Sequence, residues 1–191
     1  MQHHAFTTKY NGRTRVLFNQ VSVFLPVAPE EARTQNFELK EYLAIWDTGA
    51  THSAITKKVV DDLKLQPTGV RETRHAGGKS SNNTYLVNIA LPNEVIVPHV
   101  RVTEVQLIPD DNVSDDKQPQ LLIGMDIISL GDFVVTNTND KTTFSFRVPS
   151  VQEIDFIPDT QEHNIMEGGN RAQRRALQAK KRKRKPNLPR K

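Results

Sequence analysis

The sequence predicts a mostly β fold with one or two short helices, followed by a charged tail. Val21, Val23 and Leu25 alternate with polar or outward-facing neighbours, which is the period-two pattern of a half-buried strand. The run over residues 42–46 is apolar and short, as expected of a strand buried on both faces. Strand-like segments with intervening turn residues then continue from residue 70 to residue 105.

The other elements follow in chain order. Thr56 is placed to cap a short helix through Leu63, and Pro67 and Gly69 then prevent the helix from continuing. Turn residues over 77–83 and at 92–93 indicate a long hairpin. The last part of the fold is predicted to contain a strand over 121–123, a helical piece over 127–130, and strands over 133–136 and 143–148.

A length of 191 residues fits one domain with tails. We expect an N-terminal arm over residues 1–15, the folded domain over 16–149, an acidic linker over 150–169 and a basic disordered tail over 170–191. The tail carries eleven Lys and Arg and no Asp or Glu, so 15 basic residues face all 22 acidic residues elsewhere and the body is at −7. Repulsion between like charges and the lack of apolar side chains predict a tail without structure.

Composition excludes several classes of site. The absence of cysteine rules out disulfides and thiolate metal sites, and the six histidines show no paired metal spacing, so we expect neither a metal nor another cofactor. The first ten residues lack the apolar run of a signal peptide, and no stretch approaches the roughly 18–20 apolar residues of a membrane span. We therefore expect a cytoplasmic protein that does not contact membranes.

The candidate catalytic residue is Asp47, because the buried strand delivers it directly into the turn Asp47-Thr48-Gly49. Burying a carboxylate costs several kcal/mol unless it is paired, so a sequence that does so usually has a use for it. Gly49 permits close backbone approach, and the Thr48 hydroxyl can bond across a symmetric partner. Two such turns facing each other could share a proton and activate water. The simpler alternative is that Asp47 only caps a turn.

The surroundings of Asp47 resemble the retroviral-type, or retropepsin-like, aspartic protease family. The resemblance rests on the apolar strand before Asp47, on Ala50-Thr51 after it, and on an apolar-apolar-glycine segment about 75 residues later. Residues 142–149 are similar to the closing strand of the bacterial single-lobe members. The likeness covers about residues 16–149. It implies a closed barrel with one lobe per chain, completed as a homodimer that hydrolyses peptide bonds in extended polypeptide.

The resemblance also assigns roles to individual residues. Asp47 would be the catalytic carboxylate, supplied by each of two chains. Its supporting turn would contain Thr48, Gly49 and Ala50, and the last of these would line an adjoining subsite. A hairpin flap over residues 74–85 would close over the substrate, with Gly77 and Gly78 near its tip. The floor under the dyad would be formed by Leu122, Ile123 and Gly124.

One departure from the family concerns an ion pair. Viral members pair an acidic residue shortly after the Asp-Thr-Gly-Ala alanine with an arginine after the second glycine, whereas Thr51-His52 and Met125 stand in those neighbourhoods here. The pair is therefore absent, and with it the support it gives to dimer contacts. Asp126 is predicted to cap the following helix, and Asp159-Thr160-Gln161 lacks the glycine of a second motif.

Two rival functions belong to other classes. One is a dimerisation or peptide-binding module of the same fold that cleaves nothing, against which the retained Asp-Thr-Gly argues. The other is a nucleic-acid-associated protein whose body is only a platform for the tail. The segment from Arg171 to Lys191 has two equal interpretations: an arm that binds nucleic acid or another polyanion weakly and non-specifically, or a solubilising extension. No aromatic residue interleaves its charges, so base stacking is not supported.

Overall fold

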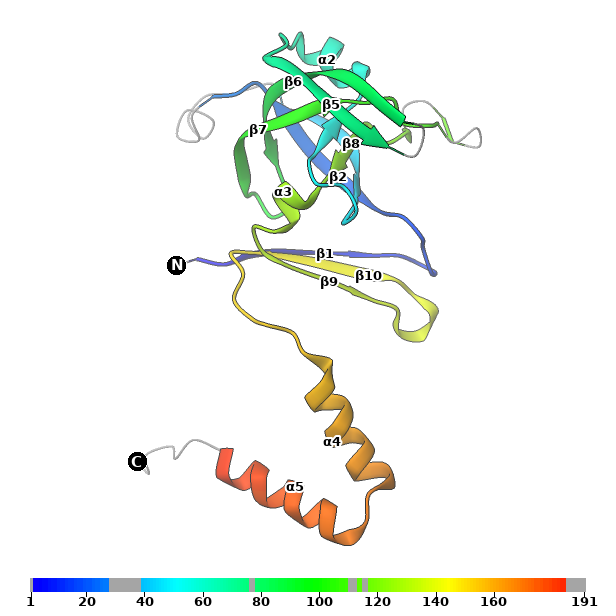
Figure 1. Ribbon diagram of the computed structural model, residues 1–191, viewed down its shortest axis with the longest axis vertical. Helices are drawn as coiled ribbons and strands as arrows, with labels where there is room; N and C mark the ends of the chain where they lie inside the picture. Colours follow the sequence, from blue (N-terminus) through cyan, green and yellow to red (C-terminus); the bar gives the residue numbers. More distant parts are fainter. Residues whose placement is uncertain (1, 28–38, 76–77, 110–112, 115–116, 185–191) are drawn as a thin grey trace. The chain divides into compact units, whose positions relative to one another are not determined.

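The computed structural model describes residues 2–27, 39–75, 78–109, 113–114 and 117–184 (Figure 1). The chain divides into two compact units, Met1–Val151 and Gln152–Lys191, each described by itself. The first unit consists mainly of strands with a few short helices, so the predicted mostly β fold is confirmed. No helix in the described part of the chain is long and apolar enough to cross a bilayer.

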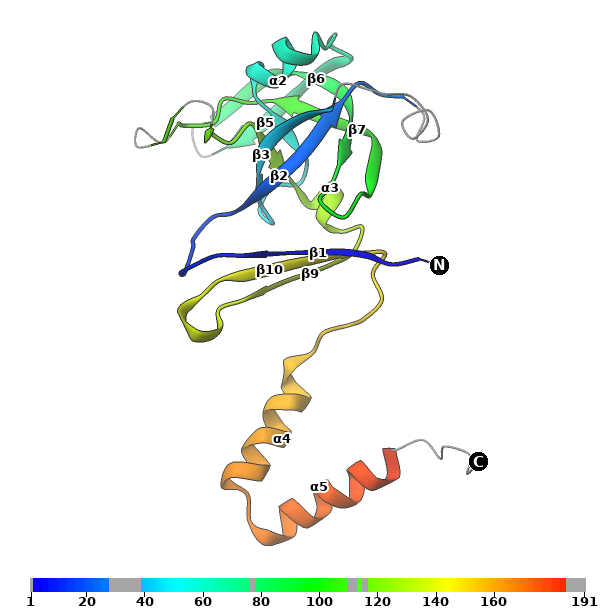
Figure 2. The same ribbon diagram turned by 180° about the vertical axis from the view of Figure 1, so that it is seen from behind.

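Six strands of the first unit close into a barrel. In order around the barrel they are β2 (Leu17–Phe24), β3 (Lys40–Trp46), β8 (Leu121–Ile123), β4 (Ala54–Ile55), β7 (Ile96–Glu104) and β6 (Gly78–Ala90). Antiparallel pairing of β2 with β6 closes the circle. Figure 2 shows β2 and β3 side by side. The predicted closed barrel is thus present, with a packed interior as expected for a barrel of this size.

The strand before Asp47 is buried because it lies inside this barrel wall. β3 pairs antiparallel with β2 on one side and parallel with β8 on the other. Tyr42, Ala44 and Trp46 face the core and are buried, whereas Leu43 and Ile45 on the other face are half-buried. The prediction of burial on both faces therefore holds fully for one face and partly for the other.

A second, three-stranded sheet forms a separate layer from the barrel (Figure 1). Its order is β1 (His4–Lys9), β10 (Thr143–Val148) and β9 (Asp132–Thr136), all antiparallel. The predicted arm over residues 1–15 is therefore wrong for β1, which is an edge strand of the domain. Phe6 explains the difference, because its ring lies 5.6 Å from that of Trp46 and 5.8 Å from that of Phe144.

Two short helices follow β4 and β8 in the chain. α2 (Lys57–Leu63) confirms the helix predicted after Thr56, although the Thr56 hydroxyl donates to the Gln120 side chain instead of capping the helix. α3 (Met125–Ile128) begins two residues before the predicted piece over 127–130. A single 3-10 turn, η2 (Thr138–Asp140), joins β9 to β10.

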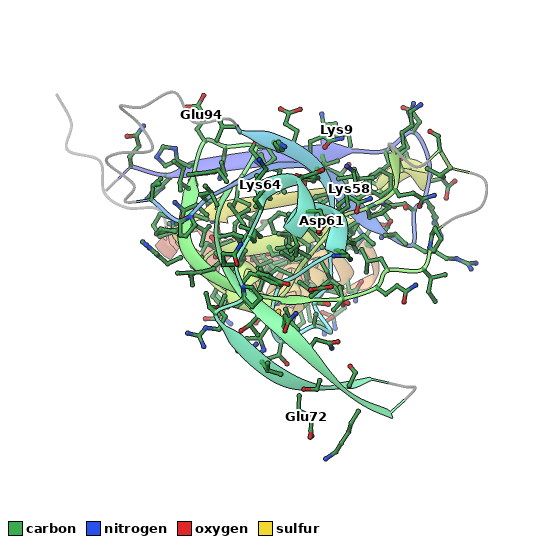
Figure 3. The ribbon with its side chains drawn as sticks, turned by 90° about the horizontal axis from the view of Figure 1, so that it is seen from above. Lys9, Lys58, Asp61, Lys64, Glu72 and Glu94 are labelled. Atoms are coloured by element: carbon green, nitrogen blue, oxygen red, sulfur yellow. The ribbon has the colours of Figure 1, made fainter. Side chains whose placement is uncertain are left out.

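The long hairpin pairs β5 (Gly69–His75) with β6, and Figure 3 shows it projecting from the body with Glu72 on it. His75 pairs with Gly78, and the predicted tip residue Gly77 lies outside the described residues. The predicted turn over 77–83 is too long. Residues from Gly78 onward continue β6, because cross-strand partners such as Glu72, opposite Ser81, hold them in the ladder.

The second unit contains α4 (Phe156–Gly168) and α5 (Arg171–Arg184). The predicted acidic linker and disordered tail are therefore wrong for these two segments, and residues 185–191 lie outside the described residues. A reciprocal capping box starts α5, since Gln173 N–H donates to Asn170 Oδ1 at 3.0 Å and Asn170 N–H donates to Gln173 Oε1 at 2.9 Å. Leu177 is buried within this unit, so local capping and packing outweigh the repulsion between like charges.

Candidate active site

Asp47 stands at the first position after β3, where the chain turns out of the barrel wall. Its N–H donates to the carbonyl oxygen of Ile123 at 2.9 Å, which continues the pairing of β3 with β8. Its Oδ1 accepts a hydrogen bond from Gly49 N–H at 2.8 Å, and its carbonyl oxygen accepts one from Ala50 N–H at 3.2 Å. The turn therefore fixes the carboxylate from both its main chain and its side chain, while the residue remains half-buried.

The apolar-apolar-glycine segment passes directly beneath this turn. In the parallel register Ile45 pairs with Leu122 and Trp46 with Ile123. Gly124 follows at a point where the backbones touch, because a Cβ there would lie 2.6 Å from the carbonyl carbon of His52 and 2.9 Å from the carbonyl oxygen of Ala50. Only glycine fits this approach, so the spacing between the two segments depends on its missing side chain.

Two further hydrogen-bonded contacts join the same segments. Met125 N–H donates to the carbonyl oxygen of Ala50 at 2.8 Å. Asp126 accepts from Ser53, whose N–H lies 3.0 and 2.9 Å from the two carboxylate oxygens and whose hydroxyl lies 2.7 Å from Oδ1. The prediction that Asp126 caps α3 is wrong, since the N-cap is Gly124 and the carboxylate turns back toward Ser53.

Comparison with protein families gives a match to aspartyl proteases over residues 34–127, a range that includes the turn, the hairpin and the glycine segment. This segment of the chain is therefore similar in sequence to aspartyl proteases. Comparison with curated proteins gave no match.

Two solved structures of proteases are similar to this chain. One is a retropepsin-like aspartic protease from Rickettsia conorii, with 14% identity, a TM-score of 0.43, and coverage of 78% of this chain and 97% of that chain. The other is the simian foamy virus (mac) protease in solution, with 14% identity, a TM-score of 0.35, and coverage of 58% of this chain and 91% of that chain.

Aromatic rings of the second sheet pack on Trp46 and hold the end of β3. The Trp46 ring stacks on that of Phe133 with 5.7 Å between centroids and 8° between planes, and lies 5.2 Å from the ring of Phe146. Its Nε1–H donates to Asn19 Oδ1 at 2.9 Å. Because Trp46 is fixed from the second sheet and from β2, the residue after it has little freedom to move.

The structure brings most of the residues of the predicted site together. The turn over Asp47, Thr48, Gly49 and Ala50 lies against the segment 122–124, with Thr48 and Gly49 exposed on the single chain. Gly78 begins β6 with φ +121°, a conformation that suits glycine.

Ser53 and Asp126 were missed as partners by sequence reasoning. Their contact joins residues 73 positions apart, and only the Ser-Asp composition near the two motifs could have suggested it. Over the described residues, no group of three or more His, Asp or Glu side chains gathers where it could hold a metal ion.

Proposed function

We propose that this protein is an aspartic endopeptidase whose active site contains Asp47 from each of two identical chains. The observation that carries the proposal is the Asp47 turn itself. A buried strand brings a carboxylate to the surface, and the Gly49 N–H holds one oxygen while the residue stays accessible. A carboxylate fixed in this way suits proton transfer, since its orientation costs nothing at the moment of reaction.

The proposed chemistry needs one proton shared by two carboxylates. The ionised aspartate removes a proton from water, and the water oxygen attacks the carbonyl carbon of the peptide bond. The protonated aspartate donates to the carbonyl oxygen, which gives a neutral tetrahedral intermediate. This intermediate collapses when the C–N bond breaks, the nitrogen takes a proton from one carboxyl group, and the other recovers the proton of the intermediate's hydroxyl. The products are a carboxylic acid and an amine.

A second copy of the chain is the proposed source of the other carboxylate. Asp126, which follows the residue bonded to Ala50 of the Asp47 turn, is engaged by Ser53. The second sheet offers a means of association, because β1 and β9 are its two edges. Along an antiparallel strand, the backbone groups of successive residues point to opposite sides. Tyr10 N–H donates to the carbonyl oxygen of Thr142, on the side of β10, so the backbone groups of Ala5 and Thr7 point to the open edge. Such an edge can pair with an identical strand.

We propose an extended polypeptide as the substrate. Peptides in extended form bind by adding a strand to an open sheet edge, and β5 is the outermost strand of the seven-stranded sheet. The hairpin of β5 and β6 is therefore the proposed flap. Backbone pairing would supply affinity, and side-chain pockets such as one beside Ala50 would supply selectivity.

We further propose that α5 gives the protein weak, sequence-independent affinity for polyanions. Eight of its fourteen residues are Lys or Arg and none is acidic, and Arg171, Arg174 and Arg175 are exposed. Its most apolar side chain, Leu177, is buried within the unit, so the exposed surface is cationic and does not suit insertion into a bilayer. Binding of a single-stranded polynucleotide should weaken with added salt, because phosphate contacts release counterions.

A chain ending at Val151 tests the α5 proposal. Polynucleotide binding should be lost in this truncated protein, whereas peptide cleavage should be unchanged because residues 152–191 form their own compact unit. Equal polynucleotide binding by both chains would place the affinity on the first unit and contradict the proposal.

The experiment that tests the enzyme compares wild type with Asp47→Asn on a library of peptides. Asn keeps the shape of the side chain and its hydrogen bond from Gly49 but cannot act as a base, so cleavage should fall to below about one per cent of wild type. Dimerisation and thermal unfolding of the variant should match wild type. If wild type binds peptides without cleaving them, the non-catalytic module is the correct function. If both proteins cleave equally, the catalytic residue is not Asp47.

A further inference from the structure

We infer that Asp126 is a positioning residue for the Asp47 turn and acts through Ser53. The inference rests on the proposed protease function and adds to it a link between the reactive turn and helix α3. The two residues form a pair that is made within one chain, so the link exists before any second copy binds.

Ser53 and Asp126 form several hydrogen bonds although they are far apart in the sequence. Ser53 gives both of its donors to Asp126, through its N–H at 3.0 and 2.9 Å and its hydroxyl at 2.7 Å. The same hydroxyl oxygen accepts from Gly124 N–H at 3.0 Å. Ser53 is only 1% exposed, so water is poorly placed to replace these bonds. Hydrogen bonds to an ionised carboxylate are about twice as strong as neutral ones.

The pair of Ser53 and Asp126 is the last in a series of contacts that begins at Asp47. Asp47 is tied to Ile123 through its N–H, Ala50 is tied to Met125 through its carbonyl oxygen, and Ser53 is tied to Asp126. Residues 47–53 and 123–126 therefore run against each other with contacts at three successive points. Of these, only the last involves side chains, so it is the one that substitution can remove without changing the backbone.

Loss of the pair would leave the segment 51–53 free to move relative to α3. Between the Asp47–Ile123 bond on one side and the pairing of β4 with β8 on the other, the bond from Met125 N–H to Ala50 would then be the remaining contact. A displacement of the reacting group by about 1 Å is sufficient to lower a rate by about 100-fold. In the proposed mode of binding, the hairpin of β5 and β6 supplies substrate affinity, so the loss should appear in kcat more than in KM.

The matched variants are Ser53→Ala, Asp126→Asn, the double variant, and Ser129→Ala as a control that removes an exposed hydroxyl near the end of α3. We expect Ser53→Ala to lower kcat by about 10- to 100-fold with KM within about twofold of wild type. Ser53→Ala removes the hydroxyl bond and leaves those of the Ser53 N–H, whereas Asp126→Asn weakens all three because the acceptor loses its charge. The double variant should therefore be no worse than Asp126→Asn. Ser53→Thr restores a hydroxyl and should recover part of kcat, and Ser129→Ala should match wild type.

Hydrogen exchange gives a readout that does not depend on cleavage. The Met125 N–H is protected by its bond to Ala50, so Ser53→Ala should speed its exchange while leaving the core amide of Ile55 unchanged. If wild type cleaves no peptide, the protease proposal fails and this exchange measurement alone decides the link.

Two results would overturn the inference. Unchanged kcat together with unchanged Met125 exchange in Ser53→Ala would mean that the pair holds nothing in place. A parallel fall of kcat, thermal stability and dimer affinity, with no recovery in Ser53→Thr, would mean that the pair only stabilises the fold. Should Asp126→Asn fail to fold, the Ser53 variants still carry both tests.

Discussion

Gly124→Ala should damage both stability and catalysis, because the added methyl has no room. Its Cβ would stand 2.6 Å from the His52 carbonyl carbon and 2.8 Å from the His52 oxygen, whereas ordinary contacts begin at 3.4 Å. Both neighbours are backbone atoms, so the segment 50–52 must retreat by about 0.8 Å. That movement would stretch the 2.8 Å bond between Met125 N–H and Ala50 beyond hydrogen-bonding range.

The magnitude follows from these two effects. Overpacking costs about 1–3 kcal/mol and the lost backbone bond about 1 kcal/mol, so unfolding should become easier by about 2–4 kcal/mol. For a domain of this size the melting temperature should fall by about 4–16 °C. Cleavage should drop by about 100-fold, since the displaced segment continues directly into the Asp47 turn.

Calorimetry and peptide cleavage measure the two effects. Gly12→Ala is the matched control, because nothing lies within 4 Å of the Cβ it would add, and its stability should stay within about 0.5 kcal/mol of wild type. A Gly124→Ala protein that melts with wild type and cleaves at the full rate would refute the reasoning about close approach.

Three further predictions concern assembly and pH. Activity per chain should fall on dilution, because the proposed dyad exists only in the dimer, and a specific activity that stays constant below the dissociation constant measured by sedimentation would exclude the homodimer. The rate of cleavage should be bell-shaped in pH, since only the singly protonated dyad is active, and a rate that rises steadily to high pH would point to a single general base. Hydrogen bonds from Ser150, Arg147 and the Val151 N–H hold the pKa of Asp132 well below its usual range. The stabilisation from Asp132 should therefore be present above the unfolded value of about 3.9 and be lost as pH falls below it, so the gap in melting temperature between wild type and Asp132→Asn should shrink in acid. A gap that stays constant across the acid range would contradict this assignment.

The sequence predicts local features well where one segment determines the outcome. The apolar run 42–46 ends in Asp47-Thr48-Gly49, and both the strand and the turn form as expected. Both features depend on neighbouring residues in the sequence, namely a run of apolar side chains and a glycine in the turn. The sequence also contains the capping box of α5, as Asn170 followed three residues later by Gln173. The high charge of the tail led to a prediction of disorder instead.

Features that depend on distant partners could not be read in this way. β1 is short and polar apart from Phe6, and it becomes a strand because β10 lies beside it across more than 130 residues. The missing viral-type ion pair was visible in Thr51-His52 and Met125. The contact between Ser53 and Asp126, which joins the same two segments, could not be predicted. A hydrogen bond between side chains depends on how β4, β8 and α3 are placed in three dimensions.

The pairing of β1 with β10 also has a consequence for the order of synthesis. β1 leaves the ribosome before the strands of the barrel, whereas its neighbour in the sheet is the last strand of the first unit to emerge. Until then the Trp46 ring lacks Phe144 and Phe146, two of its aromatic neighbours. A nascent chain can therefore form parts of the barrel early but cannot complete the layer under the Asp47 turn, which delays a finished site until translation has passed β10. Trp46 fluorescence in stalled chains of increasing length would locate that step.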